Sequence, residues 1–533
     1  MDLWQLLTAL PEKEVRGESA NPAVTGVTQD SRCVEPGFVF VCISGYCTDG
    51  HNYIEDAVQR GAVAVIVEKD LAWAEAKAKE TTETQRHRDT RRKAQTPDAA
   101  GSAVLIRVRN GREALALLSA AFYRHPSASM RVIGITGTNG KTTTSFLTTS
   151  ILEAAGHAVG LTNTLICRIK GQEREADRTT PESVDLQRTL RQMVDQGCQY
   201  AVVEVSSHSL VLNRVLGCEF DVGVLTNITG DHLDFHLTFD EYRKAKLKLF
   251  TGLAQGEKRP KAAVLNLDDP SFGIVRESTG VEVLSYSQTE KASIWAERID
   301  ASRSGLRFVV HTPAGTVEIQ SPLIGLHNVS NILAAIGAGV AEGISLDHIQ
   351  EGIGRVLPVP GRFETIDCGQ DFWVVVDFAH TADALQNLLQ TARLLEPRRI
   401  MTVFGCGGDR DQSKRFPMGQ VVARLSDRFI ITNDNSRSED PAAIARTVEE
   451  GVKSVIGCRQ AGAAEKYEVI LDRRQAIEKA LLWAEAGDMV LIAGKGHEQY
   501  QIIGSCCIPF DDRQVARQIL TGLVQAAERG GGK

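Results

Sequence analysis

The sequence lacks any apolar stretch long enough to cross a bilayer. Its longest apolar run, residues 62–67, is far shorter than the roughly 20 residues that a membrane-spanning helix needs. The first residues carry neither a basic flank nor a long apolar core, so they do not have the pattern of a secretory signal. We therefore expect a cytoplasmic protein with no membrane span.

Regularly spaced cysteines and an excess of positive charge are also absent. The 11 cysteines form an odd set in which Cys506 and Cys507 are the only close pair. This spacing fits neither a disulfide framework nor a four-ligand zinc site, so we expect reduced thiols. A formal net charge of −7 supplies no global basic field. That charge argues against a protein that coats nucleic acid. Small anionic ligands can still bind at local sites.

The composition excludes disordered, collagen-like and coiled-coil chains, because 43% hydrophobic and 24% charged residues are close to the globular average. A length of 533 residues is too great for one core and, at about 150 residues per domain, predicts three or four domains. We find no internal repeat. Short β-branched runs alternate with helical patterns, which predicts α/β domains with parallel sheets.

We place the domains at residues 1–110, 111–357 and 358–533, with the last boundary at the turn-rich residues 358–361. A helix is expected at residues 382–395. Buried strands are expected at residues 37–43, 62–68, 131–136, 201–206, 223–227, 262–266, 373–378, 399–404, 429–432 and 489–493.

Residues 77–100 stand apart within the first domain. They contain no Ile, Leu, Val or Phe and cannot supply apolar surface to a core, so we interpret them as a solvated polar insertion. The insertion carries a basic cluster formed by Arg86, Arg88, Arg91, Arg92 and Lys93. Contact with nucleic acid is one interpretation of this cluster, and an ordinary solvated loop is the one that we favour.

The strongest local signal is the glycine-rich segment 134–143, which follows a β-branched strand and precedes a helical run at residues 145–155. This is the context of a phosphate-binding loop, in which backbone N–H groups face phosphate oxygens. Lys141 would pair with the β- and γ-phosphates, and Thr142 would place a hydroxyl on magnesium. The segment departs from the common nucleotidase pattern at Ile135, where that pattern has glycine. A glycine-rich turn without a ligand is the alternative interpretation, and ATP binding is the one that we favour.

Two other polar groups follow buried strands. Glu204 interrupts an apolar strand, where a buried carboxylate needs a cation or hydrogen-bond donors, and we favour a metal role. Asp231 and His232 follow another strand, at the edge where parallel sheets bind ligands. By itself, His232 is more often a structural residue.

A third candidate is Lys246, through its position on a predicted helix at residues 239–250. At helical spacing it shares a face with apolar residues, namely Phe239, Tyr242, Leu249 and Phe250. Lys244 and Lys248 point elsewhere. A buried lysine must be paired, neutralised or modified, whereas a snorkelling lysine needs no special role, and these alternatives stay open on physical grounds.

Together these motifs resemble the Mur ligase family, ATP-dependent amide-bond-forming enzymes of peptidoglycan precursor synthesis. The resemblance covers nearly the whole chain. It rests on residues 136–142, 204–208, 226–227, 231–234, 242–246, 327–331, 361–364 and 377–381. It implies a three-domain α/β architecture with a central P-loop ATPase-type parallel sheet and a C-terminal Rossmann-like domain. The three domains would bind a UDP-linked substrate, ATP and an amino acid, in that order.

The resemblance also implies roles for individual residues. ATP would be bound by Gly137, Thr138, Asn139, Gly140, Lys141, Thr142, Thr143, Asn227, His327, Asn331, Arg362, Asp377 and His380. The UDP-muramoyl-dipeptide would be bound by Ser31, Tyr46, Cys47, Thr48, Thr179, Thr180, Ser206 and Arg214. Arg178 and Leu212 depart from the asparagine and glutamine that relatives often carry beside these positions.

In the same way, the catalytic group would be Lys141, Glu204, His232 and Lys246, with Lys246 carbamylated. Thr142, Glu204, His232 and the carbamate would hold Mg²⁺. A carbamate turns a costly buried cation into an anionic oxygen ligand, which suits a hard metal ion.

Three C-terminal motifs, at residues 405–415, 434–437 and 494–498, are typical of the branch that adds the third residue of the stem peptide. The amino acid would be bound by Arg415, Asp434, Asn435, Ser436, Arg437, Gly494 and Glu498. The guanidinium of Arg437 fits the distal carboxylate of meso-2,6-diaminopimelate and would repel the ammonium of lysine. Ser436 replaces the usual proline, which removes a preset φ from this loop.

The resemblance therefore implies a monomeric ligase that uses ATP and Mg²⁺ to add meso-2,6-diaminopimelate to UDP-N-acetylmuramoyl-L-Ala-D-Glu through an acyl phosphate. A lysine-adding ligase and a folylpolyglutamate-type ligase are the enzymatic alternatives. A nucleotide-dependent switch or scaffold is the non-enzymatic one. The uridine-site and amino-acid motifs argue against the folate ligase, and the retained catalytic residues argue against the switch.

Overall fold

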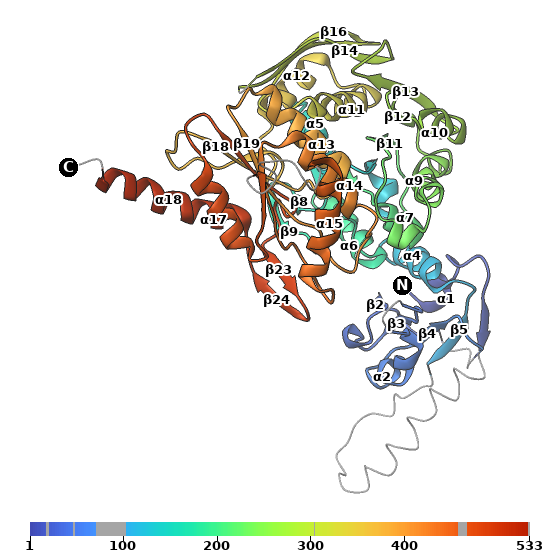
Figure 1. Ribbon diagram of the computed structural model, residues 1–533. Helices are drawn as coiled ribbons and strands as arrows, with labels where there is room; N and C mark the ends of the chain where they lie inside the picture. Colours follow the sequence, from blue (N-terminus) through green and yellow to red (C-terminus); the bar gives the residue numbers. More distant parts are fainter. Residues whose placement is uncertain (17–20, 46–47, 71–102, 303, 457–465, 531–533) are drawn as a thin grey trace, which may run out of the picture. The chain divides into compact units, whose positions relative to one another are not determined.

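The computed structural model describes residues 1–530 except 17–20, 46–47, 71–102, 303 and 457–465 (Figure 1). The described chain forms two compact units. The first comprises Met1–Gly134, Ala158–Asp221 and Gly252–Lys261, and the second comprises Ile135–His157, Val222–Thr251 and Ala262–Lys533. The predicted insertion at residues 77–100, with its basic cluster, lies outside the described residues, and the domain boundaries placed after residues 110 and 357 stay predictions.

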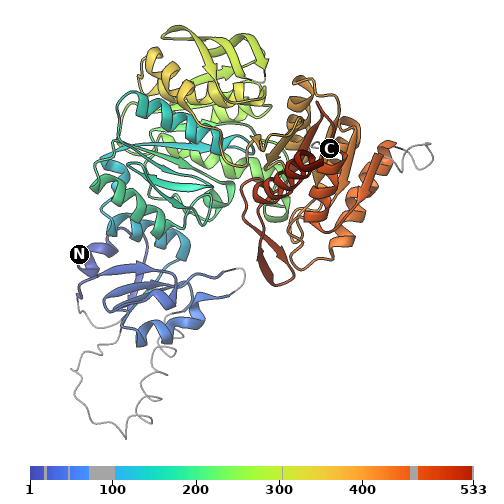
Figure 2. The ribbon, with the colours of Figure 1, turned by 90° about the vertical axis from the view of Figure 1, so that its left-hand side faces the viewer.

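The N-terminal sheet of the first unit has the strand order β1-β5-β4-β3-β2, drawn in blue in Figure 2. Its strands are β1 (Glu14–Arg16), β2 (Gly26–Thr28), β3 (Phe38–Val41), β4 (Ala64–Val67) and β5 (Val104–Arg107). All pair in parallel except β1, which is antiparallel to β5. The helices are α1 (Leu3–Leu7), α2 (Ile54–Gln59) and α4 (Gly111–Phe122). Because β4 is apolar at every position, it is buried on both faces.

The remaining strands of the first unit have the order β10-β7-β8-β9. They are β7 (Val159–Thr162), β8 (Ile166–Ile169), β9 (Gln172–Glu175) and β10 (Tyr200–Glu204), with helices α6 (Ser183–Asp195) and α7 (Ser207–Val211). β10 is parallel to β7, and β8 and β9 continue as antiparallel strands. The strand β6 (Arg131–Thr136) contributes residues to both units.

In the second unit, β11, β12 and β13 are parallel, and β14, β15 and β16 form an antiparallel meander beyond them. The strands are β11 (Val222–Leu225), β12 (Ala262–Asn266), β13 (Glu282–Ser287), β14 (Ile294–Ser302), β15 (Gly305–Thr312) and β16 (Gly315–Ser321). The helices are α5 (Lys141–Ala154), α8 (Leu233–His236), α9 (Phe239–Leu253), α10 (Phe272–Ser278), α11 (His327–Ala341) and α12 (Leu346–Arg355). α11 is apolar on nearly all sides and is buried along most of its length.

The second unit also contains a sheet with the order β17-β18-β22-β19-β20-β21. Its strands are β17 (Glu364–Thr365), β18 (Trp373–Asp377), β19 (Ile400–Phe404), β20 (Arg428–Ile431), β21 (Tyr467–Val469) and β22 (Met489–Ala493), all parallel except β17. The remaining elements are α13 (Ala382–Leu394), α14 (Arg415–Leu425), α15 (Pro441–Ile456), α17 (Arg473–Trp483), α18 (Asp512–Gly530) and the hairpin β23 (Tyr500–Ile503) with β24 (Cys506–Pro509).

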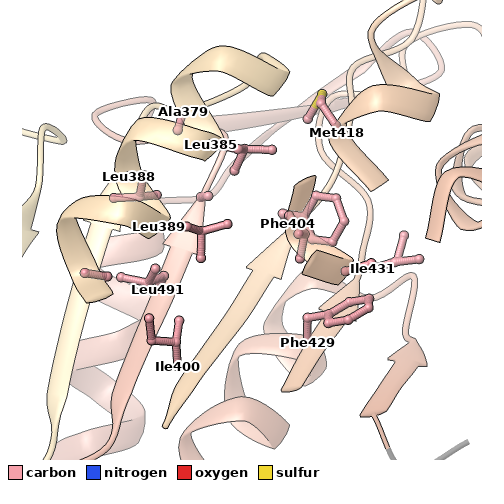
Figure 3. Packing of buried hydrophobic residues seen from close by; sticks show 14 of the residues in the cluster. Ala379, Leu385, Leu388, Leu389, Ile400, Phe404, Met418, Phe429, Ile431 and Leu491 are labelled. Carbon is pink, nitrogen blue, oxygen red and sulfur yellow. The ribbon is translucent and has the colours of Figure 1, made fainter. Parts of the chain in front are cut away.

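Two layers of helices cover this C-terminal sheet because alternate residues of each strand face opposite sides. Val375 and Leu491 pack with residues of α13, α14 and α15, as Figure 3 shows for Leu385, Leu388 and Leu389 of α13. The neighbouring positions Val374, Val376, Val490 and Ile492 pack with α17 and α18. This three-layer arrangement leaves the carboxyl ends of the parallel strands for loops.

The predicted strands agree closely with the observed ones. Residues 131–136, 262–266 and 489–493 are strands over the predicted ranges, and the others differ by one or two residues at one or both ends. The helix predicted at residues 145–155 begins at Lys141, because its first turn is polar and gives no apolar signal. Among the described residues, no helix is both long and apolar enough to span a bilayer.

The core of the C-terminal sheet predicts a contrast between two leucines. Leu491 is fully buried in β22, whereas Leu482 on α17 is 58% exposed. We expect Leu491→Ala to lower the free energy of unfolding by about 2–5 kcal/mol, because it removes buried methyl groups and leaves a cavity. Leu482→Ala should change it by less than about 0.5 kcal/mol. Urea unfolding checks both variants, and an equal loss in the two would contradict this packing.

Candidate functional site

The phosphate loop lies between β6 and α5 in the conformation that the glycines require. Gly137 and Gly140 have φ values of +149° and +86°. A Cβ atom at Gly137 would collide with Thr226, and one at Gly140 would collide with Asn331, so both positions need glycine for space as well as for φ. The Lys141 ammonium donates to the carbonyl oxygens of Gly137 and Thr138 at 3.1 and 2.9 Å. The loop and the start of α5 thus offer N–H groups and a cation to an anion.

Asn139, at the tip of the loop, is held from two directions. Its backbone N–H donates to Oδ1 of Asn227 at 2.9 Å, and its carbonyl accepts from Nδ2 of Asn227 at 3.0 Å and from the Thr226 hydroxyl at 2.6 Å. Its side-chain amide donates to Asp383, at the start of α13, at 2.9 Å. Burial raises the pKa of Asp383. Asn227 was a predicted site residue, whereas Asp383 was not.

Lys246 faces inward, as the helical spacing predicted. It is 1% exposed, and Nζ donates to the Gly137 carbonyl at 2.7 Å and lies 4.5 Å from the centre of the Tyr242 ring. The Tyr242 hydroxyl lies 2.9 Å from Oγ1 of Thr138. The expected position of Phe239 on the same buried face was wrong: it is 38% exposed, because it is the first residue of α9 and lies at the surface. The second unit therefore brings Lys246 directly against the phosphate loop.

The buried carboxylate Asp231 lies near two histidines and a lysine that come from three loops. It is 5% exposed, and its oxygens lie 3.5 Å from His232 Nε2, 3.9 Å from His380 Nε2 and 3.9 Å from the Lys414 ammonium. Burial alone would raise the pKa of Asp231, but these neighbours hold it well below its ordinary value. The predicted residues His232 and His380 are thus brought together around Asp231, which was a candidate from the sequence, and Lys414, to which the sequence had assigned no role.

Asp377 shapes the loop that follows β18. The two oxygens of the Asp377 carboxyl group accept hydrogen bonds from the backbone N–H groups of Phe363 and Ala379, both at 2.7 Å. Burial raises the pKa of Asp377. The Arg362 guanidinium lies over the Phe378 ring, 4.6 Å from its centre. Asp377 therefore joins the loop before β17 to the loop after β18, and Arg362 contacts the second of these loops.

His327 and Asn331 lie at the start of α11. Burial and the charge of Arg362 lower the pKa of His327 to about 4. Its Nδ1 atom is 3.3 Å from Oγ1 of Thr391. Asn331 adjoins Gly140 and donates to Oδ1 of Asn328 at 2.9 Å. Asn331 therefore lies at the phosphate loop, and His327 is held as a neutral ring.

Glu204 lies in the first unit, where its carboxylate already has donors. The side chain is 1% exposed, and its oxygens accept from the backbone N–H of Thr164 at 3.0 Å and from the Thr164 hydroxyl at 3.1 Å. The Thr180 hydroxyl donates to the Glu204 carbonyl at 2.8 Å, and the Ser206 N–H donates to that hydroxyl at 3.0 Å. Thr164, which the sequence analysis missed, therefore positions Glu204 among predicted dipeptide-binding residues.

Arg214 belongs to the same group in the first unit. Its guanidinium pairs with Glu182 at 2.7 Å and donates to the Thr180 carbonyl at 3.4 Å. Burial lowers the pKa of Arg214 from its ordinary value. Arg178, the departure noted in the sequence, pairs with Glu182 at 2.9 Å. Thr179 completes the group, because its hydroxyl oxygen lies 3.0 Å from that of Thr164.

The predicted metal ligands divide between the units. Glu204 is in the first, and Thr142, His232 and Lys246 are in the second. Three of these four offer an oxygen or nitrogen lone pair, but an unmodified lysine has only donors. In the described part of the chain, His, Cys, Asp and Glu side chains form no group of three or more that could hold a metal. With a carbamate on Lys246, each of the four predicted residues would have a lone pair to offer to a metal ion.

The predicted uridine site lies in the N-terminal sheet. Ser31 is 7% exposed and begins a short 3₁₀ turn capped by Asp30, and the Thr48 hydroxyl lies 3.1 Å from the Tyr53 hydroxyl. Tyr46 and Cys47 lie outside the described residues. His51, which the sequence analysis missed, is fully buried between Asp49 and the backbone N–H of Glu68, at 2.6 and 3.0 Å.

The predicted amino-acid site lies at the carboxyl ends of β19, β20 and β22. Arg415 is 3% exposed, and its guanidinium pairs with Glu439 at 2.8 Å. Arg437 has a φ of +51° and donates to the Gly408 carbonyl at 2.7 Å. A Cβ atom at Gly494 would come within 2.7 Å of Oδ2 of Asp434, so a side chain there would disturb that carboxylate. All three loops thus present charged groups at one edge of the sheet.

Asn435 and Glu498 meet across this edge. Nδ2 of Asn435 donates to Oε2 of Glu498 at 2.9 Å, and the Lys495 ammonium donates to the same oxygen at 2.7 Å. Lys495 is fully buried and also donates to Oδ1 of Asn435 at 3.1 Å. Lys495 lies within the motif at residues 494–498, but the sequence analysis gave it no role. A lysine three residues before the predicted site residue Glu498 was the signal that could have identified it.

The loop that contains Ser436 is held by backbone hydrogen bonds, although Ser436 replaces the usual proline. The backbone N–H of Arg437 donates to the Ile502 carbonyl at 3.1 Å, and its carbonyl accepts from the Gly504 N–H at 2.7 Å. Hydrogen bonds to the β23 hairpin therefore hold the loop where a proline ring would have preset φ. The Ser436 hydroxyl is buried and has no hydrogen-bond partner among the described residues.

Comparison with known proteins gives matches over nearly the whole chain. Three family models match: "Mur ligase family, catalytic domain" at residues 23–123, "Mur ligase middle domain" at 135–339 and "Mur ligase, glutamate ligase domain" at 361–496. A UDP-N-acetylmuramoyl-L-alanyl-D-glutamate–2,6-diaminopimelate ligase of Geobacillus thermodenitrificans is 44% identical, over 97% of this chain and 99% of that protein. The protein of the same name from Bacillus licheniformis is 42% identical, over 98% and 100%.

A solved structure of a UDP-N-acetylmuramoyl-L-alanyl-D-glutamate–2,6-diaminopimelate ligase also matches. It is 30% identical, covers 98% of this chain and 100% of its own, and has a TM-score of 0.65. A folylpolyglutamate synthase of Mycobacterium tuberculosis matches at 18% identity with a TM-score of 0.59, which is a likeness of fold. The three-domain fold and the α/β class expected from the sequence are confirmed.

The buried ring of His327 predicts a dependence of stability on pH. Its pKa is about 4 in the folded chain and about 6.5 when unfolded, so between these values the unfolded chain binds the proton. Folding is therefore favoured above pH 6.5, and this contribution is lost as the pH falls toward 4. We expect His327→Gln to lose less stability than the wild type between pH 7 and 5 in denaturant unfolding. His348→Gln, at an exposed position of α12, should keep the wild-type slope, and equal slopes in all three proteins would contradict the prediction.

Proposed function

Because the chain belongs to the Mur ligase family, we propose that it is the ATP-dependent ligase that joins meso-2,6-diaminopimelate to UDP-N-acetylmuramoyl-L-Ala-D-Glu. Relatives of nearly equal length that are named for this reaction support the proposal. The observation that carries the choice of amino acid is Arg437, whose guanidinium lies in a loop at the carboxyl edge of the C-terminal sheet. A planar guanidinium binds a second carboxylate in a way that no lysine substrate could use.

ATP would bind at the phosphate loop. The N–H groups of the loop and of the first turn of α5 face the phosphates, and Lys141 exchanges its two carbonyl partners for phosphate oxygens. Arg362 and His380 contribute from the loops around β18, and Asp377 positions these loops through two backbone hydrogen bonds. The Lys141 and Arg362 cations would offset the negative charge that develops during phosphoryl transfer.

Magnesium would be held by Thr142, Glu204, His232 and a carbamate on Lys246. Thr142 and Glu204 are 3% and 1% exposed, so their oxygens are shielded from bulk water. When bound, the ion supplies charge stabilisation to the phosphate oxygens. Thr164 keeps the Glu204 carboxylate oriented through two hydrogen bonds, and Asp231 keeps His232 in place.

The reaction would proceed in two steps. The D-glutamyl γ-carboxylate attacks the γ-phosphorus of ATP, forming an acyl phosphate and releasing ADP. The amino group of meso-2,6-diaminopimelate then attacks the acyl carbon, forming the amide and releasing inorganic phosphate and a proton. A carboxylate is a poor acyl donor until it is phosphorylated, which is why the reaction consumes ATP.

The substrate groups would be placed by residues of both units. Ser31, Thr179, Thr180, Ser206 and Arg214 would bind the UDP-linked dipeptide, and Arg415, Asp434, Asn435, Arg437, Gly494 and Glu498 would bind the amino acid. Glu182 shields the Arg214 charge until a substrate carboxylate or phosphate competes for it. Glu439 does the same for Arg415.

The first test offers the purified protein UDP-N-acetylmuramoyl-L-Ala-D-Glu, ATP and Mg²⁺ with either meso-2,6-diaminopimelate or L-lysine. Phosphate release and product mass should show tripeptide formation with meso-2,6-diaminopimelate alone, because Arg437 repels the lysine ammonium. Formation of the lysine product would overturn the choice of amino acid. The absence of product with both would overturn the ligase proposal.

The same assay measures the contribution of Arg437. We expect Arg437→Met to raise the KM for meso-2,6-diaminopimelate by about 10- to 100-fold, the value of a charged hydrogen-bonded pair, while the KM for ATP stays near the wild-type value. Arg474→Met is the matched control, because Arg474 lies on α17 and its guanidinium bonds only Gln518 among the described residues. Equal changes in the two variants would argue against a selecting role for Arg437.

A second prediction concerns the carbamate. After incubation with ¹³C-bicarbonate, we expect a carbamate carbon signal in the NMR spectrum of the wild type that is absent from Lys246→Ala. Lys248→Ala should keep the signal, because Lys248 is exposed on the same helix. Since the modification supplies an oxygen ligand, Lys246→Ala should also lose most ligase activity. A signal that survives in Lys246→Ala would place the modification elsewhere.

A further inference from the structure

A row of buried charges runs through the C-terminal sheet to the amino-acid site. It starts at Asp512 and Arg473, which are both fully buried and pair through two hydrogen bonds of 2.8 and 2.7 Å. Arg473 also donates to the Ala493 carbonyl, immediately before Gly494, at 3.0 Å. The deepest pair of the row is therefore attached to the end of β22, which carries one of the amino-acid loops.

The row continues through Asp434. This carboxylate is 7% exposed and accepts from the backbone N–H of Asn435 at 2.6 Å. A Cβ atom at Gly494 would lie 2.7 Å from Oδ2 of Asp434 and 3.9 Å from the Arg473 guanidinium, so these two groups adjoin the same backbone position. Burial would raise the pKa of Asp434, but the positive charges of Lys495 and Arg473 lower it below the ordinary value. Asp434 is thus an anion near two buried cations.

Lys495 and Glu498 end the row. The Lys495 ammonium and the Asn435 amide both donate to Oε2 of Glu498, at 2.7 and 2.9 Å. Asn435 is itself held, because its Oδ1 accepts from Lys495 at 3.1 Å and from the Ile502 N–H at 3.0 Å. In the part of the chain that the structure describes, Oε1 of Glu498 receives neither a hydrogen bond nor an ion pair, and the side chain is 19% exposed.

The signs along the row alternate: Asp512, Arg473, Asp434, Lys495 and Glu498. Three carboxylates and two cations leave one negative charge, and that excess lies at the accessible end. A cation placed at Oε1 of Glu498 would continue the alternation and neutralise the row. Under the proposed function, the group that meets this requirement is the amino group of the incoming amino acid in its ammonium form.

We propose that Lys495 is a positioning residue for the incoming amine. By occupying Oε2, its ammonium fixes the rotation of the Glu498 carboxylate and leaves Oε1 directed to the substrate amine. Asn435 cannot do this alone, because a neutral amide does not compensate a partly buried carboxylate. The inference rests on the proposed function and adds to it a residue that acts through Glu498 without touching the substrate.

The experiment compares Lys495→Met, Glu498→Gln and the double variant in steady-state assays of the ligase. Each assay measures KM separately for meso-2,6-diaminopimelate, the UDP-dipeptide and ATP. We expect Lys495→Met to raise the KM for meso-2,6-diaminopimelate by about 10- to 100-fold, and the other two values by less than about twofold. Because Lys495 acts through Glu498, the double variant should be no worse than the worse single variant.

Lys479→Met is the matched control. Lys479 lies on α17 of the same unit, is 44% exposed and contacts Glu468 at 3.8 Å, so the same chemical change there should leave all three KM values at the wild-type level. Lys495→Gln keeps a hydrogen-bond donor without the charge and should give an intermediate rise. This variant also decides the matter if Lys495→Met does not fold.

Three results would overturn the inference while leaving the ligase proposal intact. They are an unchanged KM for meso-2,6-diaminopimelate in Lys495→Met or in its substitute Lys495→Gln, an equal rise of all three KM values, and effects that multiply in the double variant. The second would show that Lys495 only maintains the fold. A wild-type protein that forms no product with any amino acid would instead overturn the proposed function, and the inference with it.

Discussion

The chemistry proposed for this chain requires charged groups at the ends of buried strands, where an ion without a partner is too costly to maintain. The groups described here have compensating partners, several of them from distant parts of the chain. Glu204 accepts two hydrogen bonds from Thr164, and Asp231 is surrounded by His232, His380 and Lys414. These partners also hold the reactive groups in place. The same contacts therefore compensate the buried charges and position the side chains.

Parallel strands supply the common framework. In the C-terminal sheet, side chains alternate between two helical layers, so β18, β19, β20 and β22 are buried along most of their length, and their carboxyl ends open onto the loops that carry the predicted site. β19, β20 and β22 thus deliver Arg415, Asn435 and Glu498 to one edge although these residues are far apart in the sequence. The antiparallel hairpin β23–β24 then supports the loop that carries Arg437 through backbone hydrogen bonds.

Local patterns predicted much of the site. The spacing of glycines predicted the phosphate loop, and the structure shows that Gly137 and Gly140 are required there by φ and by contact with Thr226 and Asn331. Helical spacing placed Lys246 on a buried face. Groups that act in pairs across long separations could not be found in this way: Asp383 bonds Asn139 across 244 residues, and neither position alone indicates the contact.

By itself, the sequence determined the α/β class and the strand positions and predicted a phosphate loop, because alternating apolar runs and glycine spacing are local properties with local physical causes. The tertiary structure decided which partner each buried charge has. It placed Lys246 on the Gly137 carbonyl, Thr164 on Glu204, and Lys495 between Asn435 and Glu498. Those pairings depend on which strand ends adjoin in the folded sheets, and no single segment of the chain contains that information.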